Sequence, residues 1–369
     1  MTANKIKAFI KDEIVLIISA ICAGLTMLLV PPDKEYSEYI DFRVLCLLLS
    51  LMAVVEGFKK SGVFGSLTFQ LLSRIKNGRT LGLTLILLPF FSSMLVTNDV
   101  ALIIFIPFTI NLLKKSDYSN KIVPVIVMQT IAANLGSMAT PIGNPQNLFL
   151  YSAYNLDFDD FFGITLPLTA VSFAFLSIIS VFLIPEKLSF NELDEEKIPD
   201  KKQLLVFIIM FILSLLSVLR IIPYQLTTAV TVAVILIVNR GILKRVDYML
   251  LLTFVCFFII SENLGRLEAV RIFLQTLLEK NTLLASIGTS QIISNVPAAV
   301  LLSGFTDNLK ELLAGVNIGG LGTPVASLAS LITLKFYMKT PKAKIGNFLG
   351  FFTVTNIIGL IILIAFSLI

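Results

Sequence analysis

The chain has 369 residues, 56% of them hydrophobic and only 14% charged, with a formal net charge of +5 and a mean hydropathy of +0.91. A soluble domain carries about 25% charged residues, so this composition excludes an ordinary soluble protein and predicts an all-α polytopic membrane protein. Histidine is absent, which excludes serine–histidine hydrolases and histidine relays, and no phosphate-binding glycine loop occurs, so we expect neither an enzyme nor an ATP-driven pump.

Basic residues divide unevenly between the loops and predict the orientation of the chain. Six clusters hold 22 of the 29 Lys and Arg, and the other seven lie on the opposite side of the predicted membrane. Because positively charged loops stay in the cytoplasm, we expect a multi-pass protein of the cell membrane with its amino terminus inside and its carboxyl terminus outside.

The first half, 1–185, is predicted to contain a hairpin and a broken crossing. Segment 80–113 enters and leaves from the cytoplasm, which allows either two full crossings or a re-entrant helical hairpin. We interpret it as a hairpin because its counterpart in the second half is one. Segment 121–155 makes one crossing, although about 20 residues would suffice, and two prolines and a glycine within 139–145 interrupt its helix. The remaining crossings are expected near 13–30, 42–58 and 161–185.

The second half, 203–369, repeats these features in the opposite sense. An acidic segment at 186–202 is interpreted as a solvated cytoplasmic linker. After it, a hairpin at 282–305 enters from outside, with legs of only about 18 and about 14 Å as helices, too short for a core of roughly 30 Å. Glycines and a proline break the crossing at 312–334. The sequence therefore predicts an inverted repeat, with further crossings near 203–219, 224–239, 248–262 and 345–368.

The two halves also share a polar phrase inside apolar sequence. The pattern Asn-x-Gly-x₃-Thr-Pro begins at Asn134 and again at Asn317, and a polar triplet precedes each copy. One such triplet alone commonly serves to hydrogen-bond neighbouring membrane helices. A duplicated break in inverted halves, however, is typical of a transporter site. The candidate binding residues are Thr97, Asn98, Asp99, Asn134, Gly136, Thr140, Gly143, Asn144, Ser294, Asn295, Asn317, Gly319 and Thr323.

Asp99 is the only acid that this topology places near the bilayer centre. An ionisable group at that depth is a functional candidate, and we hypothesise that it binds or carries a coupling cation, Na⁺ or H⁺. The alternative is a buried carboxyl that stays protonated or caps a helix. Glu56 and Glu262 occupy matching places nearer the interfaces and are interpreted as anchors of short lateral helices, with a role in coupling as the alternative. The three cysteines lie in apolar segments without metal-ligand spacing and are interpreted as core residues.

These motifs resemble those of the ion transporter superfamily, which includes divalent anion/sodium symporters, arsenite-efflux permeases and some sodium/proton antiporters. The likeness covers nearly the whole chain and is carried by Thr97–Ala101, Ala133–Pro145, Ser294–Ala298 and Gly322–Ser327. It implies two hairpin tips and two unwound helices around one shared substrate and sodium site. It also implies an elevator motion against a scaffold, commonly in a homodimer, with arm helices near 62–75 and 266–280.

The resemblance further implies two sodium sites. Thr97, Asn98, Gly143 and Asn144 would form one, and Ser294, Asn295 and Thr323 would form the other. Asp99 and Val296 stand where the carboxylate symporters have a threonine, and the second half looks closer to the arsenite-efflux branch.

The sequence thus predicts a secondary active transporter that uses a Na⁺ or H⁺ gradient to move a small anionic solute such as a di- or tricarboxylate. No Lys or Arg lies in the motifs, so an uncharged, arsenite-like solute fits equally well. A sodium/proton antiporter is the nearest alternative, and an ion channel is less favoured. Besides a possible Na⁺ we expect no cofactor, and the expected partners are the solute, the lipid bilayer and a second copy, with no nucleic acid.

Overall fold

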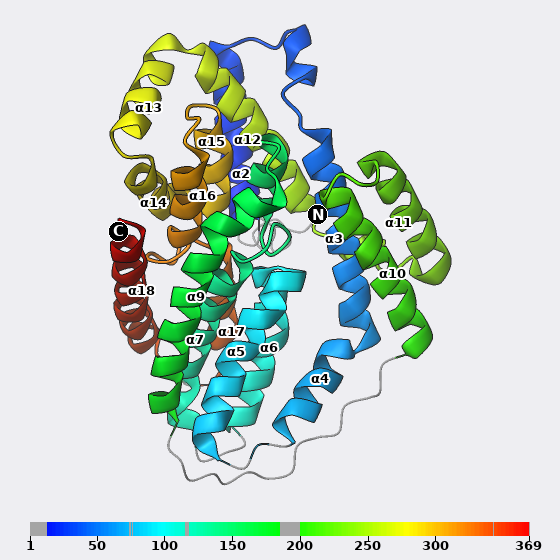
Figure 1. Ribbon diagram of the computed structural model, residues 1–369, viewed down its shortest axis with the longest axis vertical. Helices are drawn as coiled ribbons and strands as arrows, with labels where there is room; N and C mark the ends of the chain where they lie inside the picture. The colour runs from blue at the N-terminus through cyan, green and yellow to red at the C-terminus, as the bar shows by residue number, and fades with distance from the viewer. Residues whose placement is uncertain are drawn as a thin grey trace.

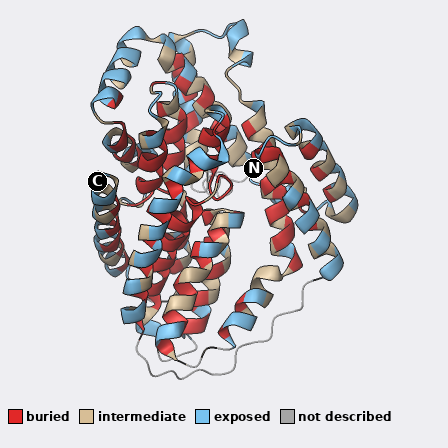
Figure 2. Ribbon diagram, viewed as in Figure 1, coloured by how far each residue is buried: buried red, intermediate tan, exposed pale blue. Residues whose placement is uncertain are grey.

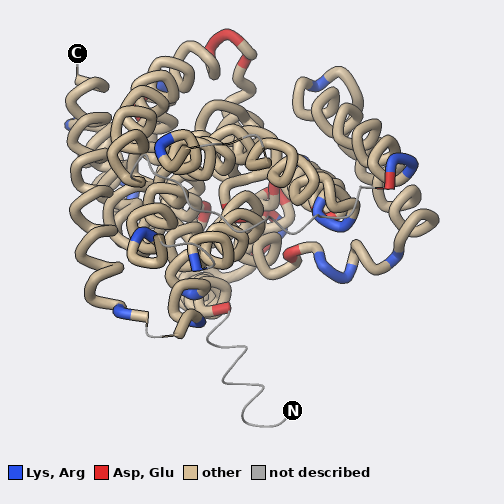
Figure 3. The backbone as a smooth tube through the Cα atoms, turned by 90° about the horizontal axis from the view of Figure 1, so that it is seen from below, with Lys and Arg blue, Asp and Glu red and all other residues tan. Residues whose placement is uncertain are grey.

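Helices make up all the regular structure of the part of the chain that the computed structural model describes (Figure 1). That part comprises residues 13–73, 75, 77–114, 118–184, 200–341 and 343–368. Seen along the long axis, charged residues are few and scattered (Figure 3). Among the described residues, the helices long and apolar enough to cross a membrane number five: α5 (Gly78–Val96), α9 (Phe158–Leu183), α10 (Lys201–Val218), α12 (Tyr248–Arg266) and α18 (Ile345–Ser367).

Five helices form what we call the peripheral group. In it, α2 (Ile14–Leu29) packs on α12, and α3 (Phe42–Ser61) packs on α10 and on α11 (Tyr224–Asn239). Phe58 of α3 meets Phe207 and Phe211 of α10 edge to face, which adds aromatic contacts to the apolar burial. Cys22 of α2 is exposed, so its interpretation as a core residue was wrong. The outer face of α2 instead carries exposed apolar side chains.

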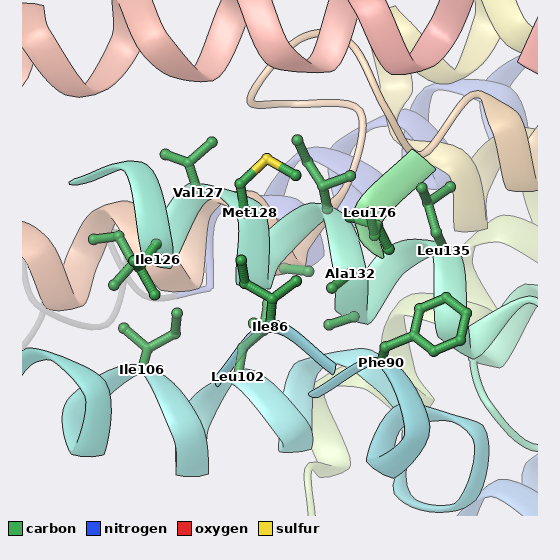
Figure 4. Packing of buried hydrophobic residues seen from close by; sticks show 14 of the residues in the cluster. Ile86, Phe90, Leu102, Ile106, Ile126, Val127, Met128, Ala132, Leu135 and Leu176 are labelled. Atoms are coloured by element: carbon green, nitrogen blue, oxygen red, sulfur yellow. The ribbon is translucent and has the colours of Figure 1, made fainter. Parts of the chain in front are cut away.

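The first hairpin consists of α5 and α6 (Asn98–Lys114), joined by Thr97 alone. Buried residues recur every three or four positions along both helices, which is the spacing of one helix face. These faces pack against α7 (Ile122–Ser137), as Ile86, Leu102 and Ile126 show in Figure 4. Every residue of α7 from 125 to 137 is buried, so α7 lies inside the molecule (Figure 2).

The second hairpin consists of α14 (Thr282–Ile293) and α15 (Asn295–Ser303), joined by Ser294 alone. Its legs have 12 and 9 residues, so neither is long enough to span a membrane by itself. In Figure 1 the first hairpin fills the lower part of the molecule and the second lies in the upper part.

Two further helices are interrupted. After α7 the chain is non-helical until α8 (Pro145–Ala153), and after α16 (Leu309–Ile318) it is non-helical until α17 (Leu328–Met338). Pro145 occupies the first turn of α8, where its missing N–H costs nothing. We call residues 138–144 the first break and residues 319–327 the second break.

The short helices α4 (Val63–Leu72) and α13 (Glu268–Lys280) lie where the arms were expected. Gly62 ends α3 in a left-handed conformation, with φ 78°, which glycine adopts without strain. Of the expected linker, 186–199 lies outside the described residues, and Asp200 caps α10. Single turns of 3₁₀ helix complete the fold: η1 (Lys34–Ser37), η2 (Ser119–Lys121) and η3 (Leu243–Arg245).

Candidate functional site

Each hairpin turns at one residue whose backbone conformation favours glycine. Thr97 has φ 73° and ψ 150°, and Ser294 has φ 74° and ψ 155°. For a residue with a side chain such a conformation costs roughly 1–3 kcal/mol, and β-branched Thr97 is an especially uncommon occupant. Strain of this kind persists only where the surroundings enforce it. The two tips therefore share one backbone geometry, and neighbouring groups must hold it.

A backbone hydrogen bond fastens each tip to the break of its own half. The Asn98 N–H donates to the Gly143 carbonyl at 3.2 Å, and the Asn295 N–H donates to the Ala326 carbonyl at 2.9 Å. Gly143 and Ala326 occupy the same place relative to the two polar phrases. Both breaks thus satisfy a backbone donor at the start of a hairpin's second helix, where no partner exists within the helix.

The two threonines of the polar phrase hold the other side of each tip. Thr140 Oγ1 donates to the Met94 carbonyl at 2.5 Å, and Thr323 Oγ1 donates to the Gln291 carbonyl at 3.0 Å. Met94 and Gln291 each lie three residues before their tip. The structure therefore uses the hydroxyl hydrogens of Thr140 and Thr323 to satisfy carbonyls at helix ends.

The two breaks are also joined to each other. Asn134 of α7 accepts on Oδ1 from the Ser327 hydroxyl at 3.0 Å, while Asn317 of α16 accepts on Oδ1 from Asn144 Nδ2 at 3.3 Å. Ser327 and Asn144 are the residues just before α17 and α8, and each of them thus donates to the asparagine of the other half of the chain. Since all four side chains are buried, these pairs satisfy groups that water does not reach.

Further amides extend this network. Asn134 Oδ1 also accepts from Asn98 Nδ2 at 2.9 Å, and Asn134 Nδ2 donates to the Gly320 carbonyl at 3.3 Å. Asn317 Nδ2 donates to Asn147 Oδ1 at 2.7 Å. The amides of both polar phrases therefore belong to one hydrogen-bond network. Such a network favours a single arrangement of the four helices that flank the breaks, α7, α8, α16 and α17.

Gly136 and Gly319 allow close helix packing. A Cβ atom on Gly136 would lie 2.1 Å from the Phe90 carbonyl oxygen, and one on Gly319 would lie 2.8 Å from the Ser290 side chain. Because these distances are below van der Waals contact, only glycine lets α7 approach α5 and lets the end of α16 approach α14 this closely. Their role is to bring the breaks against the hairpins.

Four helices begin around one small cavity of about 10 Å³. These helices are α6, α8, α15 and α17, and each N-terminus carries roughly half a positive charge. The cavity has room for about one water molecule or ion. Its lining residues are Asn98, Asp99, Pro145, Gln146, Leu250, Asn295, Val296, Ser327 and Leu328.

Asp99 faces this small cavity and a larger one. The larger cavity, of about 340 Å³, lies between the first tip and the peripheral group and is also lined by Thr97 and Asn144. Asp99 Oδ1 is buried without a hydrogen-bond partner among the described residues. An orphaned carboxylate oxygen beside amide and carbonyl oxygens suits a hard cation, so the residues present fit the expected Na⁺.

The peripheral group and the loop before α12 supply charges to the larger cavity, and of these sequence reasoning singled out only Glu56, as a helix anchor. Lys59 and Glu56 of α3 form an ion pair, and Asp247 caps α12 by accepting from the Leu250 N–H at 2.9 Å. Arg245 also lines the cavity. Since the loop between α11 and α12 supplies Arg245 and Asp247, only the fold brings them near the tip.

The structure gathers most of the candidate residues. Thr97, Asn98, Gly143 and Asn144 lie together as the resemblance implies, and Ser294 and Asn295 meet at the Ala326 carbonyl. Thr323 differs because it is exposed and bonded to Gln291. In this network, sequence reasoning missed Asn147, Gln291, Gly320 and Ser327. It also missed Gln146, which lines the small cavity. Ser327 could have been found, because it stands at the position of Asn144 in the second repeat.

Comparison with known proteins identifies the relatives of this arrangement. A family model described as citrate transporter matches residues 7–314. The chain belongs to the citrate transporter family. This confirms the resemblance predicted from the motifs and a membrane transporter with several crossing helices.

Curated relatives span most of the chain. An uncharacterized transporter of Methanocaldococcus jannaschii is 32% identical over 334 residues, which are 90% of this chain and 91% of that protein. The inner membrane protein YbiR of Escherichia coli is 30% identical over 318 residues, 85% of this chain and 84% of that protein. A silicon efflux transporter of Oryza sativa is 33% identical over 129 residues, but these are 35% of this chain and 26% of that protein.

Proposed function

We propose that this member of the family is a secondary active transporter that couples a Na⁺ or H⁺ gradient to the movement of a small anionic solute. The observation that carries the proposal is the convergence of four helix N-termini on one cavity. Together they place about two positive charges there, against the single negative charge of Asp99. An anion is therefore favoured at the N-termini, and a cation is favoured at Asp99.

The matched contacts support an inverted repeat around this cavity. Each tip bonds to its own break, each threonine bonds to its own hairpin, and the breaks exchange hydrogen bonds crosswise. The hairpins also approach from opposite ends (Figure 1). Two features support an elevator motion in this proposal: hairpins and breaks are bonded as one unit, and the larger cavity lies between the first tip and the peripheral group.

In this proposal the cation binds first. Asp99 alone repels an incoming carboxylate, and a cation held by the Asp99 carboxylate with oxygens of Thr97, Asn98, Gly143 and Asn144 would remove that repulsion. A carboxylate is larger than the small cavity, so the solute would occupy the larger cavity and meet the N-termini of α6 and α8 there without an opposing charge. Because the cation must bind at Asp99 before the anionic solute can bind, the flux of the solute depends on the cation gradient.

The test is uptake into proteoliposomes that contain the purified chain. Mono-, di- and tricarboxylates are offered under an imposed Na⁺ or H⁺ gradient, and one pair of solute and gradient should give accumulation. Asp99→Asn should abolish the dependence on the cation. Asp200→Asn is the matched control, because Asp200 is also a carboxylate near a helix start but caps α10 away from both cavities. Uptake that responds to neither gradient, for any carboxylate, would refute the proposal.

A second candidate is an uncharged, hydroxyl-rich solute such as undissociated arsenite or silicic acid. It is favoured by the absence of Lys and Arg from the lining of the small cavity and by the partial match to a silicon efflux transporter. The two candidates separate by pH: uptake of an anion follows its ionised fraction, whereas uptake of a weak acid follows the undissociated fraction. A sodium/proton antiporter would show cation exchange without any solute.

A further inference from the structure

A third cavity, of about 360 Å³, lies away from the small cavity and shares no residue with it. One wall comes from the peripheral group, through Tyr39 and Asp41 before α3 and through Phe258 and Glu262 of α12. The opposite wall comes from α8 and α15. These helices belong to what we call the bonded unit, which is the two hairpins and the two breaks with their flanking helices, joined by hydrogen bonds. We call it the α12–α15 cavity. Its size is at the lower end of the range for small-molecule sites.

Most polar groups in this lining are already bonded to the protein. The Tyr154 hydroxyl is within 2.9 Å of the Ser303 carbonyl and 2.7 Å of the Thr306 carbonyl. Ser303 Oγ donates to the Val300 carbonyl at 2.9 Å, and Ser261 Oγ donates to the same carbonyl at 3.2 Å. A ligand therefore finds few free donors here.

The groups that remain available are carboxylates and aromatic rings. Among the described residues, the Glu262 carboxylate forms no hydrogen bond or ion pair, although it interacts electrostatically with Arg266 and with Tyr39, and Asp41 uses one oxygen to cap α3. The Tyr39 hydroxyl is buried without a hydrogen-bond partner in the described part of the chain. Phe149 and Phe258 lie with their ring centroids 5.8 Å apart, and Tyr39 and Tyr154 add two further rings.

Positive charge is missing from the same lining. Of the Lys and Arg residues that the structure describes, none lines the α12–α15 cavity. Arg266 lies over the Tyr39 ring, 5.2 Å from its centroid, but its guanidinium is engaged by Asp33 and Glu35. The described residues also include no group of three potential metal-ligating side chains, which argues against a divalent metal ion.

We propose that the α12–α15 cavity binds a small organic ammonium ion. Carboxylates supply the opposite charge, and ring faces attract a cation with an apolar body, most strongly when the cation is poorly hydrated. A free solute fits better than a lipid headgroup, because a headgroup brings a phosphate and no basic residue lines the cavity to receive it. The bound ion bridges the peripheral group and the bonded unit and so slows their relative movement, a consequence that rests on the proposed transport.

The test of binding compares choline with 3,3-dimethylbutan-1-ol, its uncharged isostere, by calorimetry on the full chain in detergent. Choline should bind at least tenfold more tightly than the isostere. Glu262→Gln should weaken choline binding about tenfold, and Phe258→Leu about threefold. Glu268→Gln is the control, since Glu268 is an acid of the neighbouring helix α13 outside the lining. Equal binding of choline and the isostere, or unchanged binding by Glu262→Gln with an unchanged melting temperature, overturns the proposal.

Two further measurements separate the alternatives. In nanodiscs, choline should bind equally well in phosphatidylglycerol and in phosphatidylcholine; loss of binding in phosphatidylcholine assigns the cavity to a headgroup and overturns the free-solute proposal. Asp99→Asn should bind choline normally even though it loses coupled transport, so a failure of the proposed function leaves this binding result intact. External choline should inhibit coupled transport by the wild type but not transport by Glu262→Gln.

Discussion

Gly136 is the position where one added methyl group should damage the fold most. In Gly136→Ala the new Cβ would lie 2.1 Å from the Phe90 carbonyl oxygen, 2.7 Å from its carbon and 2.8 Å from Ser93 Oγ. Two of these atoms are backbone, so no side-chain rotation relieves the clash. Helix α7 must move away from α5, and because α7 is buried on all sides, that movement disturbs its other contacts too.

The magnitude follows from the distance. Ordinary contact begins near 3.4 Å, so the helices must separate by about 1.3 Å to relieve a contact of 2.1 Å. Overpacking on this scale costs about 3 kcal/mol, and the better helix propensity of alanine returns about 1 kcal/mol. We therefore expect Gly136→Ala to lower the free energy of unfolding by about 2 kcal/mol. Gly319→Ala should cost less, because its nearest atoms outside its own helix belong to the Ser290 side chain.

Unfolding is measured by far-ultraviolet circular dichroism during titration of detergent micelles with dodecyl sulfate, since the chain has no tryptophan. Gly163→Ala in α9 is the control: a Cβ there meets nothing within 4 Å, so this variant should gain up to about 1 kcal/mol. The expected order of stability is Gly163→Ala, wild type, Gly319→Ala, Gly136→Ala. If Gly136→Ala proves as stable as Gly163→Ala, the close approach of α7 and α5 is refuted.

Three other outcomes are expected. Thr97→Gly should raise the free energy of unfolding by about 1 kcal/mol, by relieving the positive φ, and should reduce transport; a loss of stability by the same titration would contradict the strain. Gln291→Ala should lower the free energy of unfolding by about 2–3 kcal/mol, because it removes three hydrogen bonds. Gln291 Nε2 donates to the Gly319 and Leu321 carbonyls at 2.9 Å each, and Oε1 accepts from the Thr323 N–H at 2.8 Å. The hydrogen bond from Arg266 lowers the pKa of Asp33. A carboxyl with a lowered pKa in the folded state stabilises above its unfolded pKa of about 3.9, and this contribution is lost as the pH falls through the folded pKa. The melting temperatures of wild type and Asp33→Asn should therefore differ at pH 7 and converge in acid, and a constant difference would exclude the Asp33–Arg266 bond as its source.

Local signals in the sequence were sufficient to predict the helical class, the positions of the hairpin tips to within a polar triplet, and the places where helices stop. The shortening of each connection to one residue was not predicted. Proline and glycine remove hydrogen bonds or relax the backbone wherever they occur, so the breaks around Pro141 and Pro324 are readable without a fold. A polar triplet in apolar sequence likewise marks the start of α6 and of α15. The family resemblance rested on the same residues.

Contacts between distant segments could not be predicted in this way. The crosswise bonds of Ser327 to Asn134 and of Asn144 to Asn317 join residues more than 170 positions apart. The hydrogen bonds of Thr140 and Thr323 depend on which carbonyls lie beside them, and the close packing at Gly136 and Gly319 depends on which helix lies opposite. Besides Asp99, the charged residues that line the larger cavity are Glu13, Glu56, Lys59, Arg245 and Asp247, on segments that only the tertiary arrangement brings near Asp99.

Joining each hairpin by a single residue has a consequence for how this protein can change. A connection of that length has no slack, so inserting or deleting even one residue at Thr97 or Ser294 would rotate the following helix by about 100° and turn its buried face outward. New solute preferences must therefore arise by replacing side chains at the hairpin tips, while the number of residues in each tip stays fixed. Variation in loop length is free to accumulate only where the chain meets water.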